Sequence, residues 1–115
     1  MVLIAMFAMG GCQEGDQEAR AVTGGDPGRG RQALRSYGCY ACHTIAGVPG
    51  AHGTIGPVLD RMSRRASSAG RPADLSARIQ WIRDPQGIGG PTLMPNMGVS
   101  EQDARDIAAY LYTLQ

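Results

Sequence analysis

Residues 39–43 read Cys39-Tyr40-Ala41-Cys42-His43, and this stretch decides the fold that the chain can adopt. Its two thiols are one helical turn apart, so both can reach the two vinyl groups on one edge of a porphyrin. The histidine that follows projects its imidazole toward the iron from the same side. The spacing C-x-x-C-H is the attachment signature of c-type haem. It predicts one covalently bound haem held by Cys39, Cys42 and His43.

Two other kinds of site use the same residue types. A thioredoxin-like dithiol needs its C-x-x-C pair between a strand and a helix, and no strand pattern is visible around residues 39–42. A structural zinc site could use Cys39, Cys42, His43 and His52. The adjacent Cys42 and His43 would, however, have difficulty sharing one tetrahedron. We expect His52 to be a structural loop residue and not a metal ligand.

The composition leaves little apolar material for a free-standing core. The 115 residues include 17 glycines and 7 prolines, and aromatic residues make up only 5%. A chain this short and rich in loops needs a staple such as a metal or a cofactor. Its length excludes a two-domain enzyme, a barrel and a doubly wound sheet. The net charge of +1 gives no sign of nucleic-acid binding, and no general acid–base pair or nucleophile arrangement indicates an enzyme.

Helical spacing marks three segments of the chain after residue 26, namely 28–37, 74–83 and 101–114. Asp26-Pro27 supplies a cap and a first-turn proline for the first segment. Pro85 stops the second segment, and Ser100 caps the third. Glycine- and proline-rich loops separate them, with one further turn of helix expected over residues 58–64. We therefore expect an all-α fold of three to five short helices, with long loops wrapped around one haem.

The N-terminus has the character of an export signal. Residues 2–9 are apolar throughout, which is too short for a transmembrane helix but fits the apolar region of a signal peptide. With Gly10 and Gly11 ahead of Cys12, the segment resembles a bacterial lipoprotein signal, in which the cysteine becomes lipidated. The alternative is a frayed apolar N-terminus with an incidental thiol. We expect three parts: an export signal or anchor (1–11), a flexible acidic tether (12–27) and a haem domain (28–115).

From Gly28 to Leu114 the chain resembles the class I c-type cytochromes. The resemblance rests on Cys39-Tyr40-Ala41-Cys42-His43 and on Met94-Pro95, which lies just ahead of the last predicted helix. It implies that His43 is the proximal iron ligand and Met94 the distal ligand. Met97 is a rival for the distal position, but no proline follows it.

Further residues match the pattern of that family one by one. Pro57 corresponds to the proline whose carbonyl accepts the Nδ1–H of the proximal histidine. Leu59 and Met62 are expected to pack on the porphyrin. Trp81 resembles the tryptophan near a haem propionate, with core packing as the alternative. Arg65, or Arg64 in its place, could pair with a propionate, with a solvated arginine as the alternative.

Two positions concern the contact between the first and last predicted helices. Gly30 and Tyr110 resemble the close pair at which these helices cross. Leu34 stands where the family usually has an aromatic residue on the first helix.

The resemblance implies one-electron transfer and not catalysis. With His43 and Met94 on the iron, both axial positions are filled, so no small-molecule substrate can bind there. The implied partners are redox proteins, in a respiratory or photosynthetic chain at the periplasmic face of the membrane. Two alternatives stay open: a fixed haem subunit of a quinol-oxidising or oxygen-reducing complex, and a haem sensor or small peroxidase.

Overall fold

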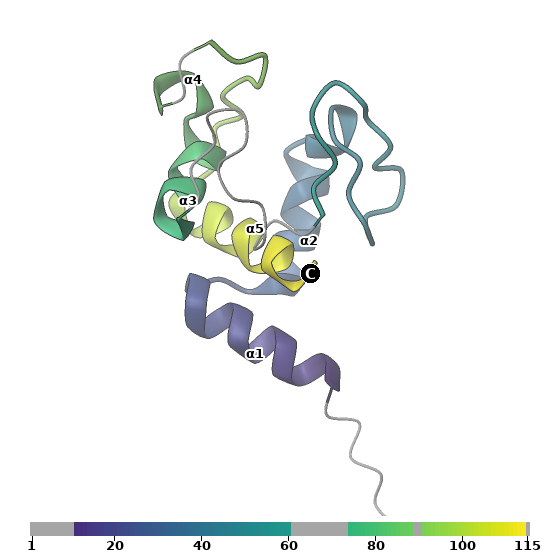
Figure 1. Cartoon of the computed structure of the whole chain (residues 1–115), viewed down its shortest axis with the longest axis vertical. Helices are drawn as coiled ribbons and strands as arrows, with labels where there is room; N and C mark the ends of the chain where they lie inside the picture. Colours follow the sequence, from purple (N-terminus) through teal and green to yellow (C-terminus); the bar gives the residue numbers. More distant parts are fainter. Residues whose placement is uncertain (1–10, 61–73, 89–90, 115) are drawn as a thin grey trace, which may run out of the picture.

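The structure is a computed structural model, and it describes residues 11–60, 74–88 and 91–114 (Figure 1). All regular elements among these residues are helical, as the sequence predicts. An isolated antiparallel bridge joins Thr44 to His52. In chain order the elements are α1 (Gly11–Thr23), α2 (Pro27–Ser36), the 3₁₀ helix η1 (Cys39–Ala41), α3 (Leu75–Arg83), α4 (Pro85–Ile88) and α5 (Glu101–Thr113).

Side-chain caps start the three longer helices after residue 26, and the caps of the first and the third were predicted from the sequence. The carboxylate of Asp26 accepts a hydrogen bond from the backbone N–H of Arg29 at the start of α2. Asp74 and Ser100 cap α3 and α5 in the same way. Each cap satisfies a backbone donor that the first helical turn leaves unpaired.

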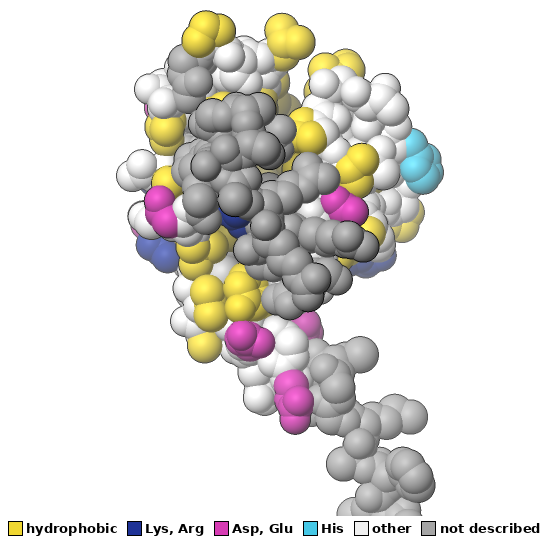
Figure 2. All heavy atoms as spheres, in the orientation of Figure 1, with side chains coloured by type: hydrophobic (Ala, Val, Ile, Leu, Met, Phe, Trp, Pro, Cys, Tyr) yellow, Lys and Arg dark blue, Asp and Glu magenta, His cyan; other side chains and the backbone are white. Residues whose placement is uncertain are grey.

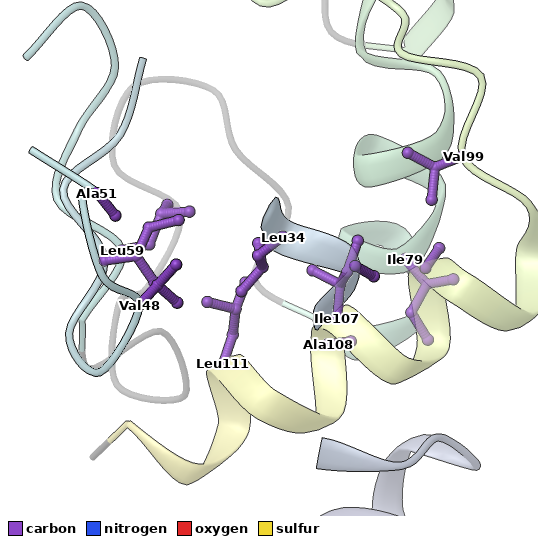
Figure 3. Packing of buried hydrophobic residues seen from close by; sticks show 12 residues of the cluster. Leu34, Val48, Ala51, Leu59, Ile79, Val99, Ile107, Ala108 and Leu111 are labelled. Carbon is purple, nitrogen blue, oxygen red and sulfur yellow. The ribbon is translucent and has the colours of Figure 1, made fainter. Parts of the chain in front are cut away.

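Helix α5 lies at the centre of the fold and contributes Ala104, Ile107, Ala108 and Leu111 to the core. Helices α2 and α3 both pack against it, and Figure 3 shows Leu34 from α2 facing the α5 side chains Ile107 and Leu111. Ile79 of α3 and Val99, which precedes α5, extend the same cluster. The apolar stripe predicted for the last helix is therefore the face on which the other helices are assembled.

The crossing of α2 and α5 depends on Gly30. A Cβ atom at Gly30 would overlap the carbonyl group of Asp106, so only glycine lets the two backbones come this close. The α5 atoms nearest to a Cβ at Gly30 belong to the backbone of Asp106 and Ile107. One turn further along α5, the Tyr110 hydroxyl donates to the carbonyl oxygen of Ala46, at 2.6 Å.

Helix α1 replaces the flexible tether expected over residues 12–27. It packs against α5, with Ala19 and Thr23 buried one turn apart. The Thr23 hydroxyl donates to the Ala19 carbonyl at 2.6 Å, and the Tyr112 hydroxyl of α5 reaches Glu18 at 3.0 Å. Glu14 and Glu18 are exposed on α1, and Figure 2 shows acidic side chains on the surface at this end of the molecule. Two small buried residues and hydrogen bonds from Arg105 and Tyr112 therefore hold α1 against α5.

Two smaller differences concern the predicted loops. The loop expected between the second and third helical segments begins with the short helix α4. Residues 58–60, the described part of the turn expected over 58–64, are not helical. Among the described residues, no helix has the length and apolar character to cross a membrane.

Candidate haem site

The C-x-x-C-H segment is formed by a tight turn directly after α2. Gly38 has a φ of 76°, a left-handed conformation that favours glycine, and it ends α2 so that η1 can begin. The carbonyl oxygen of Cys39 accepts hydrogen bonds from the backbone N–H groups of Cys42 (3.3 Å) and His43 (3.1 Å). One tight helical turn therefore carries both cysteines and the histidine.

Both cysteines are free thiols and are partly buried. Burial raises the pKa of the Cys39 thiol above its ordinary value of 9.0. A disulfide-exchange enzyme instead needs a thiol whose pKa is lowered, because the thiolate is the nucleophile. The protonation of Cys39 therefore does not fit a thioredoxin-like role, and no strand lies beside the pair within residues 11–60.

The imidazole of His43 is held in one orientation by the chain itself. His43 is only 9% exposed, and its Nδ1 lies 2.6 Å from the carbonyl oxygen of Pro57. A carbonyl oxygen only accepts, so Nδ1 carries the proton and donates it. Nε2 then keeps its lone pair for a metal. This is the hydrogen bond expected for Pro57 from the sequence.

Gly56 fixes the imidazole from a second side. Its backbone N–H donates to the carbonyl oxygen of Cys42 at 2.7 Å, which brings the loop over the histidine. A Cβ atom at Gly56 would lie only 2.7 Å from Nδ1 of His43 and closer still to Cε1. Gly53 is equally close to the backbone between Cys42 and His43. Neither role was predicted from the sequence, although the density of glycine in residues 44–57 indicates close backbone approach.

The remaining expected pocket residues lie on several elements. Leu59 is buried in the core cluster, and its backbone N–H donates to the carbonyl of Thr44 at 2.9 Å. Trp81 is half-buried on α3. Met62 and Arg65, together with Arg64, fall outside the described residues.

The two candidate distal ligands differ in their surroundings. Met94 is half-buried, and its carbonyl oxygen accepts a hydrogen bond of 2.6 Å from the side chain of Gln86. Met97 is more open to solvent, at 41% exposed. Gln86 was not predicted from the sequence, because its hydrogen-bond partners lie in the irregular segment that follows α4 and no local pattern indicates them.

The fourth residue of the zinc alternative, His52, is exposed on the loop. Its backbone N–H donates to Gly50 at 3.1 Å, which fits the structural role expected for it. Over residues 11–60, 74–88 and 91–114, no three histidine, cysteine, aspartate or glutamate side chains form a metal-binding group.

Comparison with known proteins distinguishes a haem site from a zinc site or a redox-active dithiol. A family model described as cytochrome c matches residues 28–115. The chain belongs to the cytochrome c family. It is 33% identical to cytochrome c-551 of Pseudomonas aeruginosa over 79 residues, which cover 68% of this chain and 69% of that protein. It is 27% identical to cytochrome c-551 of Stutzerimonas stutzeri over 114 residues, or 99% of this chain and 97% of the relative. No solved structure matches the chain significantly.

The donor groups of this cytochrome fit the haem of its family. Two thiols on one turn suit two thioether links, and an imidazole with Nδ1 already hydrogen-bonded presents Nε2 to an iron. The protein is a class I monohaem cytochrome with a covalently bound haem c. It is an electron carrier and not an enzyme.

Proposed function

We propose that this cytochrome transfers single electrons with its iron held between His43 and Met94. The observation that carries this proposal is the hydrogen bond from Nδ1 of His43 to the Pro57 carbonyl, at 2.6 Å. It leaves Nε2 free for a metal before any cofactor is present. Met94 supports the second half of the proposal, because it is the less exposed of the two candidate methionines and directly precedes a proline.

Each ligand has a defined effect on the redox centre. When bound, haem supplies a one-electron exchange between ferrous and ferric iron. The thioether of Met94 is a soft, neutral ligand that favours the ferrous state and so raises the reduction potential. His43 is held by Pro57 and Gly56 in one orientation, which keeps the coordination the same in both oxidation states. With both axial positions filled, substrate binding at the iron is excluded.

The other pocket residues would affect the reduction potential of the haem and the access of water to it. Leu59 and Met62 would exclude water from the porphyrin faces. A haem buried in this way disfavours the extra charge of ferric iron, which raises the reduction potential further. Arg65, or Arg64, and the indole N–H of Trp81 would hydrogen-bond the propionates and offset their charge.

Substitution of the distal ligand tests this assignment. In Met94→Ala, the weak red absorption band of methionine-ligated ferric haem should disappear, and carbon monoxide should bind the reduced protein without denaturant. The reduction potential should fall by a sizeable part of the about 0.8 V range that axial ligands control. Met97→Ala is the matched control and should retain the band and the potential. Loss of the band in Met97→Ala alone would reverse the assignment.

The place of the protein in the cell is part of the same proposal. The apolar residues 2–9 followed by Cys12 support export and lipidation, and several acyl chains would hold the protein firmly at the periplasmic face of the membrane. Its partners there would be redox proteins of a respiratory or photosynthetic chain. The mass of the N-terminal peptide of the mature protein tests lipidation. A lipid-free peptide that begins before Cys12 would contradict it.

Purification from native membranes distinguishes a mobile carrier from a fixed subunit. A carrier should be recovered alone as a monomer after mild detergent extraction. Constant recovery with a quinol-oxidising or oxygen-reducing assembly would identify a fixed haem subunit instead.

A further inference from the structure

A hydrogen-bonded clamp holds the segment that carries Met94. The side-chain amide of Gln86, on α4, donates to two carbonyl oxygens of that segment, at 2.6 Å to Met94 and 3.0 Å to Thr92. The backbone N–H of Gln86 donates to the side chain of Asn96, at 3.1 Å. One residue of α4 thus makes three hydrogen bonds to residues on both sides of Pro95.

The carboxylate of Asp84 accepts two further hydrogen bonds at this clamp. Its Oδ1 accepts a hydrogen bond from the side-chain N–H of Asn96 at 2.9 Å. The same oxygen accepts from the backbone N–H of Gly87, also at 2.9 Å, and so caps the short helix α4. A Cβ atom at Gly87 would overlap the Asp84 carboxylate. Asn96 is therefore hydrogen-bonded to both Gln86 and Asp84, and Asp84 is bonded in turn to Gly87 of α4; we call Asp84, Gln86 and Asn96 the α4 clamp.

Packing alone cannot fix the position of the Met94 segment. The segment has no regular structure between residues 91 and 98, and Leu93, next to Met94, is 87% exposed. Few apolar contacts mean that the segment can open locally at little cost. A thioether is a neutral ligand, so charge attraction to ferric iron does not hold it in place either. The hydrogen bonds of the α4 clamp tie this segment to a helix outside it.

We propose that Gln86 is a positioning residue that keeps the Met94 thioether at the iron through its hydrogen bonds to the Thr92 and Met94 carbonyls. This inference rests on the proposed function, because it requires Met94 to be the distal ligand. Gln86 itself touches only the protein backbone and the Asn96 side chain. Its effect is on the fraction of molecules in which Met94 is detached from the iron.

Binding of added imidazole to the ferric holoprotein measures that fraction. Imidazole enters only when Met94 is detached, so its apparent affinity rises in proportion to the detached population. Loss of two ordinary hydrogen bonds corresponds to roughly a tenfold to hundredfold change in such an equilibrium. Gln86→Ala should therefore bind imidazole roughly tenfold to hundredfold more tightly than the native protein.

Three further variants make the test specific. Gln86→Glu keeps the size of the side chain, but its carboxylate cannot donate to the two carbonyls, so it should behave like Gln86→Ala. Gln80→Ala removes an exposed glutamine from α3 and should leave imidazole affinity unchanged. In a Met94→Ala background, Gln86→Ala should have no further effect, because the distal position is already open.

The outcomes separate this inference from the proposed function. If the native ferric protein lacks the red band of a methionine ligand, the ligation itself is wrong. If the native protein shows the band, and the folded Gln86→Ala and Gln86→Glu variants bind imidazole no more tightly than Gln80→Ala, the clamp does not position the ligand. An equal effect of Gln86→Ala with and without Met94 would also overturn the inference.

Discussion

At the scale of single residues, two neighbours in one loop determine the orientation of His43. The Pro57 carbonyl fixes the proton on Nδ1, and Gly56 leaves the space in which the ring lies. Neither residue donates to a cofactor directly. Their effect is to prepare the imidazole before it meets an iron, which reduces the entropy that ligation would otherwise cost.

Substitution of Gly56 should disturb this arrangement. In Gly56→Ala the new methyl group meets the imidazole, so the ring or the loop must shift, and we expect unfolding to be easier by about 1–3 kcal/mol. The measurement is denaturant unfolding of the holoprotein. Gly15→Ala is the control, because a Cβ there has no neighbour within 4 Å and alanine favours the α1 helix by about 1 kcal/mol. Equal stability of Gly56→Ala and the native protein would contradict the close contact.

At the scale of secondary-structure elements, the contact of α2 with α5 connects the haem-binding turn to the core. Helix α2 leads directly into Gly38 and η1, so its position sets the position of Cys39. The contact is made by the backbones at Gly30 and Asp106. The backbone N–H of Asp26 also donates to the Asp106 carboxylate at 2.8 Å, which fixes the first turn of α2 against α5.

The crossing gives a prediction about Gly30. In Gly30→Ala the methyl group would overlap the Asp106 carbonyl, so the two helices must separate, and we expect a loss of about 3 kcal/mol or more of stability. Thermal unfolding of the holoprotein, compared with Gly15→Ala, is the measurement. A melting temperature as high as that of the control would show that the helices do not cross at Gly30.

The cap of α2 predicts a pH dependence. The hydrogen bond from the backbone N–H of Arg29, followed by that from the Arg20 side chain, lowers the pKa of Asp26 below its ordinary value of 3.8. A carboxyl whose pKa is lower in the folded state stabilises the fold above its unfolded pKa, and this contribution is lost as pH falls through the folded pKa. The native protein should therefore exceed Asp26→Asn in unfolding free energy at neutral pH. The difference should shrink below pH 3.8, and a constant difference would contradict the assignment.

Local patterns were predictable from the sequence, and contacts between distant segments were not. The cysteine and histidine spacing and the caps at Asp26 and Ser100 each involve residues within one helical turn. Helix α1 was missed because the burial of Ala19 exists only once α5 lies against it. The hydrogen bond from the Tyr110 hydroxyl to the Ala46 carbonyl joins two segments that are far apart in the sequence, so no local pattern predicts it. The acidic composition of residues 12–27 likewise gave no sign that α1 packs on α5.

At the scale of the whole molecule, α1 lies outside the part of the chain that the family model matches. The family model begins at residue 28, whereas α1 ends at Thr23 and packs on α5. In Figure 1, α1 lies on the opposite side of α5 from α4. Helix α1 should therefore affect stability without affecting the redox site.

A matched pair of substitutions on α1 tests this separation. Ala19→Glu places a carboxylate at a fully buried position, and it should release α1 from α5 and make it sensitive to protease. Ala21→Glu places the same group on the exposed side of the helix and should have little effect. Both variants should keep the native reduction potential. A shift in the potential of Ala19→Glu alone would show that α1 contributes to the haem site.

The most direct test of the central claim is the proton NMR spectrum of the reduced holoprotein. A methionine bound to haem iron lies over the porphyrin, whose ring current moves its methyl signal far upfield. The account predicts one such signal, absent in Met94→Ala and present in Met97→Ala. An upfield methionine signal that survives in Met94→Ala, or no such signal in the native protein, would contradict ligation of the iron by His43 and Met94.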